Sequence, residues 1–379
     1  MANSGLSMED VNRLATDPSV AARTGTVVLL AQQCNTQALK PAELKLAHEI
    51  FRLMIRDAEV RVREALSANL KDNPNIPRDV ALALAKDVDS VSLPMLAYSE
   101  VLTTADLVQI VNAQNSIAKM DAIAGRPTVD ESVASALVER GSEQVVAKLL
   151  ANPGAAVPEA AMHRAVDRFG ESELVLEPLV HRAVLPVTVS ERLVTHVADH
   201  LRTHLLSKHK ISADVAIDLV LQTRERATVG LAMGVGDDGL AALVTQLKDN
   251  GRLTTSLILR AICMGNLRFF EHALAALAAV PVGNARVLVH EGSGAGLRAI
   301  WAKAGLSATA FPAIRAAVNA VDQTEFEASD ATAERYARRI LERVLTQYET
   351  IGVAIDSDDL EYLLGRINQN PDGSKPTIH

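Results

Sequence analysis

Short amphipathic segments separated by brief turns account for nearly the whole chain. Within them, apolar side chains recur at three- and four-residue intervals, the spacing of one face of an α-helix. Many segments begin alike, with Pro, Ser or Thr after an apolar residue and often an acid in the next turn. Hydroxyl caps, an early Pro and acids near the positive helix end all favour helix initiation. The pattern therefore predicts a succession of short α-helices.

The start signal recurs at a nearly constant interval. It occurs at Pro77, Thr103, Thr128, Pro158, Thr188 and Ser212. Successive signals are 26, 25, 30, 30 and 24 residues apart. Two helices of about ten residues and two turns fill such an interval. Stacked helix pairs of this length are typical of an α-solenoid.

The repeat extends into the C-terminal half of the chain. Aligned without gaps at an offset of 151, residues 137–166 and 288–317 are identical at eight of thirty positions. The pairs used below are Gly141/Gly292, Ser142/Ser293 and the non-identical Leu150/Trp301. Gly suits the left-handed residue that ends many helices, and Ser suits the cap of the next helix. Both Gly-Ser pairs are therefore interpreted as turns between helices.

The predicted fold is all-α, an array of repeats with helical caps. Residues 1–57 are expected to form an N-terminal helical cap and residues 58–321 the α-solenoid. Two sub-arrays that meet near residues 205–235 are an alternative to one unbroken array. Residues 322–367 predict charged helices, whose polar outer face suits a terminal unit. Residues 368–379 predict a disordered tail.

Composition strengthens the all-α prediction and limits the function classes. Apolar residues make up 48% of the chain but aromatic residues only 3%, so small aliphatic side chains supply a core suited to helix packing. The formal charge of −8 argues against a nucleic-acid-binding surface, which is normally basic. Cys34 and Cys263 lack C-x-x-C spacing and indicate reduced thiols in a cytoplasmic protein. The sequence shows neither a signal-peptide pattern nor an apolar run of about 18–20 residues, so no membrane span is expected.

Four segments carry a family resemblance. They are VRVREALSANLKDNPNIPRDVALALAKD, SVSLPML, AICMGNLRFFEHALAALAAVP and GSGAGLRAIWAKAGL. Together they resemble an alphaproteobacterial family of uncharacterised HEAT-like helical-repeat proteins. The resemblance covers about Leu14 to Val321 and is most specific over residues 261–306. It implies an α-solenoid of short HEAT-like two-helix repeats and a bacterial cytoplasmic protein, and it implies no catalytic residues.

A glycine-rich turn, Gly292, Gly294 and Gly296 in EGSGAGLRAIWAKAGL, stands before a predicted helix. Such turns hold phosphate in many proteins. A dinucleotide site needs a βαβ unit, and although VGNARVLVH is short enough to pass for a strand, no parallel-sheet pattern surrounds it. No P-loop Lys-Ser/Thr follows the glycines. A small-ligand or nucleotide site, with Arg298 at its anion end and Trp301 nearby, remains the alternative to a turn in which Gly294 and Gly296 serve packing.

A second candidate site consists of His196, His200 and His204, which recur at four-residue spacing on one predicted helix. Two imidazoles one turn apart can chelate a transition metal. The third lies about 12 Å from the first along the helix axis, too far to share one ion. A further ligand would come from another helix, such as His163 or His181. The alternative is a polar, solvated helix face.

Mixed charges offer a third possibility. Arg52, Arg56, Arg61 and Arg63 are interleaved with acids, which is typical of solvated helix faces with weak ion pairs. Contact with nucleic acid, as in helical-repeat DNA glycosylases, is the functional alternative. Aromatic residues to hold an extruded base are scarce.

The leading functional hypothesis is a non-enzymatic scaffold or adaptor in the bacterial cytoplasm. No G-x-S-x-G or H-E-x-x-H motif is present, and no cofactor is implied. Solenoids present a concave face that holds another protein or a peptide, which is the expected partner. The family resemblance adds a setting in signalling or cell-cycle regulation. The alternatives are a small-ligand or nucleotide sensor using Gly292–Gly296 and a helical-repeat nucleic-acid binder.

Overall fold

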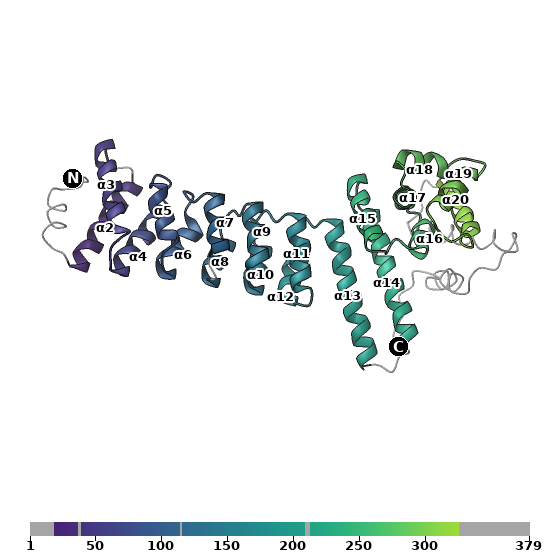
Figure 1. Ribbon diagram of the computed structural model, residues 1–379, viewed down its shortest axis with the longest axis horizontal. Helices are drawn as coiled ribbons and strands as arrows, with labels where there is room; N and C mark the ends of the chain where they lie inside the picture. Colours follow the sequence, from purple (N-terminus) through teal and green to yellow (C-terminus); the bar gives the residue numbers. More distant parts are fainter. Residues whose placement is uncertain (1–18, 37–38, 114–115, 209–212, 326–379) are drawn as a thin grey trace, which may run out of the picture. The chain divides into compact units, whose positions relative to one another are not determined.

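The chain is all-α throughout the part that the structure describes. The computed structural model describes residues 19–36, 39–113, 116–208 and 213–325, without the side chains of 201–208, 213–219, 320 and 322–325. These residues form nineteen helices, labelled α2 to α20, and no strand (Figure 1). The predicted all-α class is confirmed. Most of the predicted C-terminal helices, 322–367, and the whole predicted tail, 368–379, lie outside the described residues.

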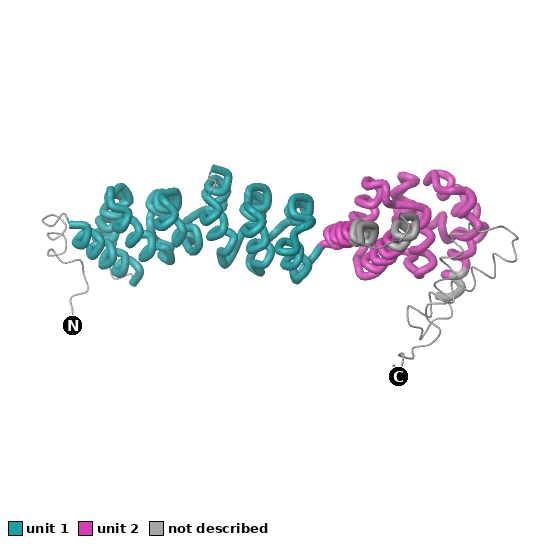
Figure 2. The backbone as a smooth tube through the Cα atoms, turned by 90° about the horizontal axis from the view of Figure 1, so that it is seen from below, with its two compact units in different colours: residues 1–185 teal, residues 186–379 magenta. Residues whose placement is uncertain are grey.

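Two compact units divide the chain between Leu185 and Pro186 (Figure 2). The division precedes the 205–235 region in which the sequence allows a junction. That region contains parts of α13 (Val187–Lys208) and α14 (Ala213–Met233), which pack against each other within the second unit. Each unit is described separately below.

The first unit contains eleven described helices. They are α2 (Val20–Asn35), α3 (Pro41–Met54), α4 (Val60–Leu70), α5 (Arg78–Ala85), α6 (Asp89–Tyr98), α7 (Thr104–Ala113), α8 (Ile117–Ala124), α9 (Glu131–Arg140), α10 (Glu143–Ala151), α11 (Glu159–Phe169) and α12 (Glu173–Val180). Each even-numbered helix packs on the next even-numbered one, and α7, α9 and α11 form a second row (Figure 1). We call the first set the even row.

Helix starts in this unit follow the predicted signals. The helices α5, α7, α9 and α11 begin at residues 78, 104, 131 and 159, so their starts are 26, 27 and 28 residues apart. The predicted signals Pro77, Thr103, Thr128 and Pro158 precede these starts by one to three residues. Local capping chemistry thus locates the helices correctly.

Successive even helices are joined through their C-terminal carbonyl groups. The buried Arg126, just after α8, donates to the carbonyls of Leu96 (2.6 Å) and Ser99 (2.9 Å) at the end of α6. Burial lowers the pKa of its guanidinium, which has no carboxylate hydrogen-bond partner among the described residues. The last carbonyls of a helix have no partner within the helix, so these bonds satisfy groups that packing removes from water.

The same connection recurs at the next two even helices. The Asn152 amide, which follows α10, donates to the carbonyls of Ala124 (2.9 Å) and Arg126 (2.8 Å) at the end of α8. Arg182, which follows α12, donates to the carbonyls of Leu150 (2.9 Å) and Ala155 (2.7 Å) around the end of α10. In these three cases, one side chain that follows an even helix bonds to the end of the preceding even helix.

Ion pairs add a second set of connections between successive helix pairs. Arg63 of α4 pairs with Asp87 before α6 (2.5 Å), and Arg78 of α5 pairs with the buried Asp106 of α7 (2.7 Å). Lys148 of α10 pairs with Asp121 of α8 at 2.5 Å. The arginines near the N-terminus that suggested a nucleic-acid contact include Arg63, whose guanidinium is thus neutralised within the fold.

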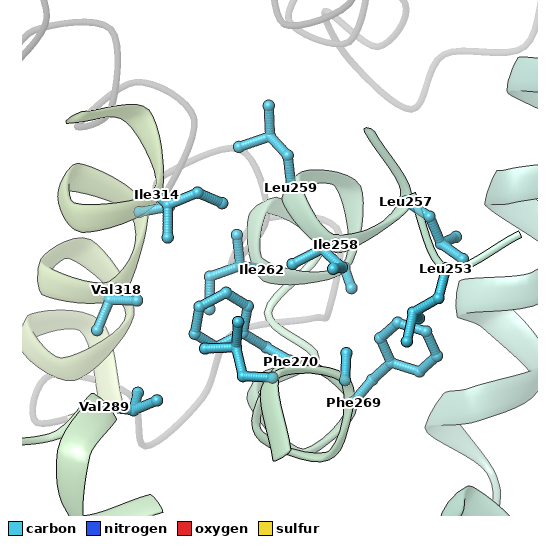
Figure 3. Packing of buried hydrophobic residues seen from close by; sticks show 14 of the residues in the cluster. Leu253, Leu257, Ile258, Leu259, Ile262, Phe269, Phe270, Val289, Ile314 and Val318 are labelled. Carbon is cyan, nitrogen blue, oxygen red and sulfur yellow. The ribbon is translucent and has the colours of Figure 1, made fainter. Parts of the chain in front are cut away.

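The second unit contains eight described helices. After α13 and α14 come α15 (Asp237–Asp249), α16 (Thr255–Cys263), α17 (Leu267–Ala278), α18 (Val282–Val289), α19 (Ala295–Lys303) and α20 (Phe311–Glu325). The helix α17 lies at the centre and packs against α15, α16, α18 and α19. Its adjacent Phe269 and Phe270 point to different sides, toward Leu253 and Ile262 respectively (Figure 3). Two successive aromatic side chains thus fill both sides of one helix.

Buried carboxylates in this unit all have cationic partners. Glu225 of α14 pairs with Arg260 of α16 at 3.0 Å, and both side chains are buried. Glu191 of α13 pairs with Arg252 and also accepts from the Gln246 amide. Removing one partner of such a pair leaves an uncompensated buried charge, so these contacts fix which helices pair.

No single helix in the described residues is long and apolar enough to cross a membrane. The pair α17 and α18 passes a length and composition test only when the two are taken together, and they are bent by 114° at the break between them.

Substitution of Asp106 tests the ion pairs between repeats. Hydrogen bonding from Arg78 lowers the pKa of Asp106 from 3.8 to about 2. A lowered folded-state pKa contributes stability above pH 3.8 that is lost as pH falls toward 2. Because Arg78 is half exposed, we expect Asp106→Asn to reduce the free energy of unfolding at pH 7 by about 1–2 kcal/mol. Urea titrations should show this difference shrinking between pH 4 and pH 2, whereas a pH-independent difference would contradict the assignment.

Candidate partner-binding groove

A groove lies between α10 and α12, the last two helices of the even row. Its volume is about 880 Å³, within the range of about 300–1,000 Å³ usual for ligand sites. Its walls are mostly apolar and include Ala147 and Ala151 of α10 and Leu174 and Pro178 of α12. Val184, in the segment after α12, closes one end. We refer to this feature as the α10–α12 groove.

Apolar side chains in the groove remain open to solvent. Leu174 is 51% exposed and Val184 is 78% exposed, whereas the neighbouring Val175 and Leu179 are completely buried. The buried pair belongs to the face of α12 that packs on the repeat, and Leu174 belongs to the opposite edge. Exposed apolar side chains gathered in a concavity are typical of interaction sites.

A proline inside α12 leaves a backbone acceptor at the groove. Pro178 is the sixth residue of α12, as Pro94 is the sixth residue of α6. Proline has no amide hydrogen, so the carbonyl of Leu174, four residues earlier, lacks its usual helical donor.

The cationic side chains around the groove are bonded to other groups of the protein. Lys148 pairs with Asp121, and the forked guanidinium of Arg182 is bonded to backbone carbonyls at the end of α10. Burial lowers the pKa of Arg182. The Nδ1 atom of His181 lies 2.8 Å from the Glu177 carbonyl, which can only accept, so Nδ1 carries a proton and donates it.

The carboxylates around the groove, unlike its cationic side chains, have few partners within the protein. Glu177 lines the groove, and Glu143 and Glu173 are the first residues of α10 and α12. All three are exposed, and none forms an ion pair with the residues that the structure describes. The Ser172 hydroxyl donates to the Glu143 carboxylate and so links the two helix starts. One carboxylate in the groove and two beside it are therefore without an ion-pair partner among the described residues.

The glycine-rich turn proves to be a self-capped helix start. VGNARVLVH forms the helix α18 rather than a strand, and Gly294 is the left-handed N-cap of α19, with φ of 73°. The Glu291 carboxylate accepts from the amides of Gly296 (3.0 Å) and Ser293 (3.3 Å). Hydrogen bonds from Ser293 and from the Gly296 amide lower the pKa of Glu291. The protein's own carboxylate thus occupies the position at a helix N-terminus where a phosphate would bind.

Two details of the predicted turns are wrong. Gly141 is extended, with φ of −65° and ψ of 154°, and not left-handed. It is glycine because an added Cβ atom would lie 2.5 Å from the Leu137 carbonyl oxygen. Ser142 does cap α10, whereas Ser293 does not cap α19, since the turn in the second unit reaches the helix one residue later.

Trp301 and Arg298, the other residues of the glycine-turn candidate site, make contacts within the fold. Trp301 is buried like its counterpart Leu150, and its indole nitrogen donates to the Ser307 carbonyl at 2.8 Å. The exposed guanidinium of Arg298 lies 5.2 Å from the ring centroid of Phe311. These contacts join α19 to the segment that leads into α20. The proposed anion role of Arg298 stays a prediction.

The three predicted metal ligands do lie on one helix, α13. His196 is half-buried and His200 is exposed, while the side chain of His204 lies outside the described residues. No group of three or more His, Cys, Asp or Glu side chains in the described part of the chain is arranged to hold a metal ion. His163 lies 3.7 Å from Glu159, and His181 is bonded to the backbone of its own helix.

Sequence reasoning did not find the groove, although part of its signal was present. Leu174 and Pro178 stand in the segment ESELVLEPLV, where apolar residues outnumber those that one helix face can bury. Such an excess, with a proline in the helix interior, indicates an exposed apolar edge. The partnering of α10 with α12 could not be inferred from that segment alone.

Comparison with known proteins gives one match. A model of the family described as an uncharacterised protein conserved in bacteria (DUF2336) matches residues 91–354, which is most of the chain. No curated protein and no solved structure matches. The match confirms the resemblance at the level of an uncharacterised bacterial family. Its restriction to alphaproteobacteria and its HEAT-like character stay predictions.

Two alanine substitutions separate packing from ligand binding in the glycine turn. A Cβ atom at Gly296 would lie 2.7 Å from the Leu288 carbonyl oxygen, whereas one at Gly292 would have no neighbour within 4 Å. We expect Gly296→Ala to lower the free energy of unfolding by about 1–3 kcal/mol, as other overpacked sites do. Gly292→Ala should change it by less than about 0.5 kcal/mol. Urea denaturation measures both, and equal stabilities would disprove the packing role of Gly296.

Proposed function

The chain belongs to the bacterial family DUF2336, and we propose that it is a non-enzymatic scaffold that holds a segment of another protein in the α10–α12 groove. The observation that carries the proposal is the exposure of Leu174 and Val184 within a concavity of suitable size. Monomeric proteins rarely leave apolar side chains together in a hollow unless something binds there.

The proposed architecture is an α-solenoid of HEAT-like two-helix repeats. The stacking of the even row, the spacing of 26 to 28 residues between helix starts, and the recurring carbonyl bonds all support it. Each repeat exposes one layer of helices to solvent, and stacked layers provide an extended surface for a polypeptide. The groove would be the deepest point of that surface.

We also propose that the protein acts in the cytoplasm. Cys34 and Cys263 are both buried, and burial raises the pKa of Cys34 to about 11. A thiol protonated at neutral pH is a poor nucleophile, which supports a structural role for Cys34. The sequence resemblance suggests signalling or cell-cycle regulation as the setting.

The alternative functions have less support. A nucleotide at the Gly292–Gly296 turn would have to displace the Glu291 carboxylate from the amides of α19. Nucleic acid would meet a chain of net charge −8, in which Arg63 and Arg78 are already paired with carboxylates.

Photo-crosslinking tests the proposed function. Benzoyl-phenylalanine replaces Val184 in the groove or, as a matched control, Val287 of α18, which is 71% exposed. Irradiation of the full chain in cytosol of the bacterium that encodes it should give a discrete protein adduct from position 184 only. Leu174→Asn should abolish that adduct, because a buried amide without hydrogen-bond partners opposes binding. Equal labelling from both positions, or none from position 184, would count against the proposal.

A further inference from the structure

We propose that the segment held in the α10–α12 groove is cationic and amphipathic, with apolar side chains in the groove and lysine or arginine side chains on its carboxylates. This inference rests on the proposed function of the groove and adds the chemistry of its partner. It follows from which charges at the groove are already neutralised by the protein and which are not.

The positive charges at the groove are committed to the fold. Lys148 lies 2.5 Å from Asp121, so the two cancel. Arg182 directs both terminal nitrogens of its guanidinium at backbone carbonyls, at 2.9 Å from Leu150 and 2.7 Å from Ala155. A guanidinium held in this way cannot turn to meet a carboxylate on a partner without leaving those carbonyls unbonded. An acidic segment would therefore find no free cation here.

Three carboxylates, in contrast, are free to accept a partner. Glu173 and Glu177 are one helical turn apart on α12 and so project on the same side of that helix. Glu143 stands at the start of α10, next to the start of α12, because the Ser172 hydroxyl bonds to it. Glu177 lines the groove, and Glu143 and Glu173 stand beside it at the two helix starts. These three exposed carboxylates outnumber the one guanidinium of Arg182 and favour a cationic partner.

The backbone also supplies an acceptor rather than a donor. Pro178 deprives the Leu174 carbonyl of its helical partner, and that oxygen belongs to a residue that lines the groove. Ammonium and guanidinium groups are donors only. The acceptor and the nearby Glu177 carboxylate therefore match the same kind of side chain.

The apolar part of the partner follows from the groove walls. Ala147, Ala151, Leu174, Pro178 and Val184 provide a surface without side-chain hydrogen-bonding groups. A volume of about 880 Å³ accommodates a few large aliphatic side chains. Apolar contact would supply most of the affinity, and the carboxylates would select the charge of the flanking residues.

Three labelled peptides of fourteen residues test the inference. They share leucines at helical spacing, and their other positions carry Lys, Gln or Glu. Fluorescence anisotropy with the full chain should show the Lys peptide binding at least about tenfold more tightly than the Gln peptide, and the Glu peptide most weakly. The preference should decline with added salt.

Charge reversal in the protein provides the matched comparison. Glu177→Lys should weaken binding of the Lys peptide about tenfold and strengthen that of the Glu peptide. Glu131→Lys, at the exposed first residue of α9, makes the same change in net charge away from the groove and should change binding less than about twofold. Glu177→Gln provides a milder variant at the same exposed position, and circular dichroism confirms that each variant is folded.

Each outcome decides a separate point. Equal binding of the Lys and Gln peptides, weakened by Leu174→Asn, would refute the charge preference and leave the proposed groove function intact. Equal effects of Glu177→Lys and Glu131→Lys would show only general attraction to an acidic protein and would refute the inference. Failure of all three peptides to bind would refute the inference and weaken the proposed function with it.

Discussion

The first unit depends on the bonding of helix-terminal carbonyls by a side chain from the next helix pair. Its even helices α6, α8, α10 and α12 have only eight to ten residues. In a helix this short, the last four carbonyls are nearly half of all the carbonyl groups. Isolated helices of this length are marginal in water. Arg126, Asn152 and Arg182 satisfy carbonyl groups at the ends of α6, α8 and α10 from outside each helix, so each of these three helices is completed by its neighbour.

This constraint also shapes the groove. Because Arg182 is bonded to the end of α10, it positions the segment that carries Val184, and both terminal nitrogens of its guanidinium are directed at carbonyls. The carboxylates of α12 are then left without an internal counter-charge. The hydrogen bonds from Arg182 to the end of α10 thus leave an apolar groove with acidic side chains in it and beside it. The proposed recognition depends on these two properties.

Local chemistry in the sequence predicted the helices, and contacts between distant residues explain what it did not predict. Pro77, Thr103 and Pro158 marked helix starts correctly because capping acts within one turn. The prediction of a left-handed Gly141 was wrong. Glycine is required there for its small size, because an added Cβ atom would lie too close to the Leu137 carbonyl oxygen. The groove requires α10 and α12 to be neighbours. The bond between Ser172 and Glu143 that links their starts joins residues 29 apart in the sequence, a separation that no local pattern specifies. Glu291, which caps α19 from before the glycines, shows how one side chain can turn an apparent phosphate loop into a structural turn.

Amide hydrogen exchange of the Arg182→Met variant tests the central claim most directly. Removing the guanidinium leaves the Leu150 and Ala155 carbonyls without its hydrogen bonds, a loss of about 1–3 kcal/mol in local stability. Exchange should accelerate in the second half of α10 and in residues 181–184, while α4 and α6 keep their wild-type rates. Arg164→Met, which removes an exposed ion pair with Glu139, serves as the control and should leave α10 unchanged. Wild-type exchange in α10 of the Arg182→Met variant would contradict the account.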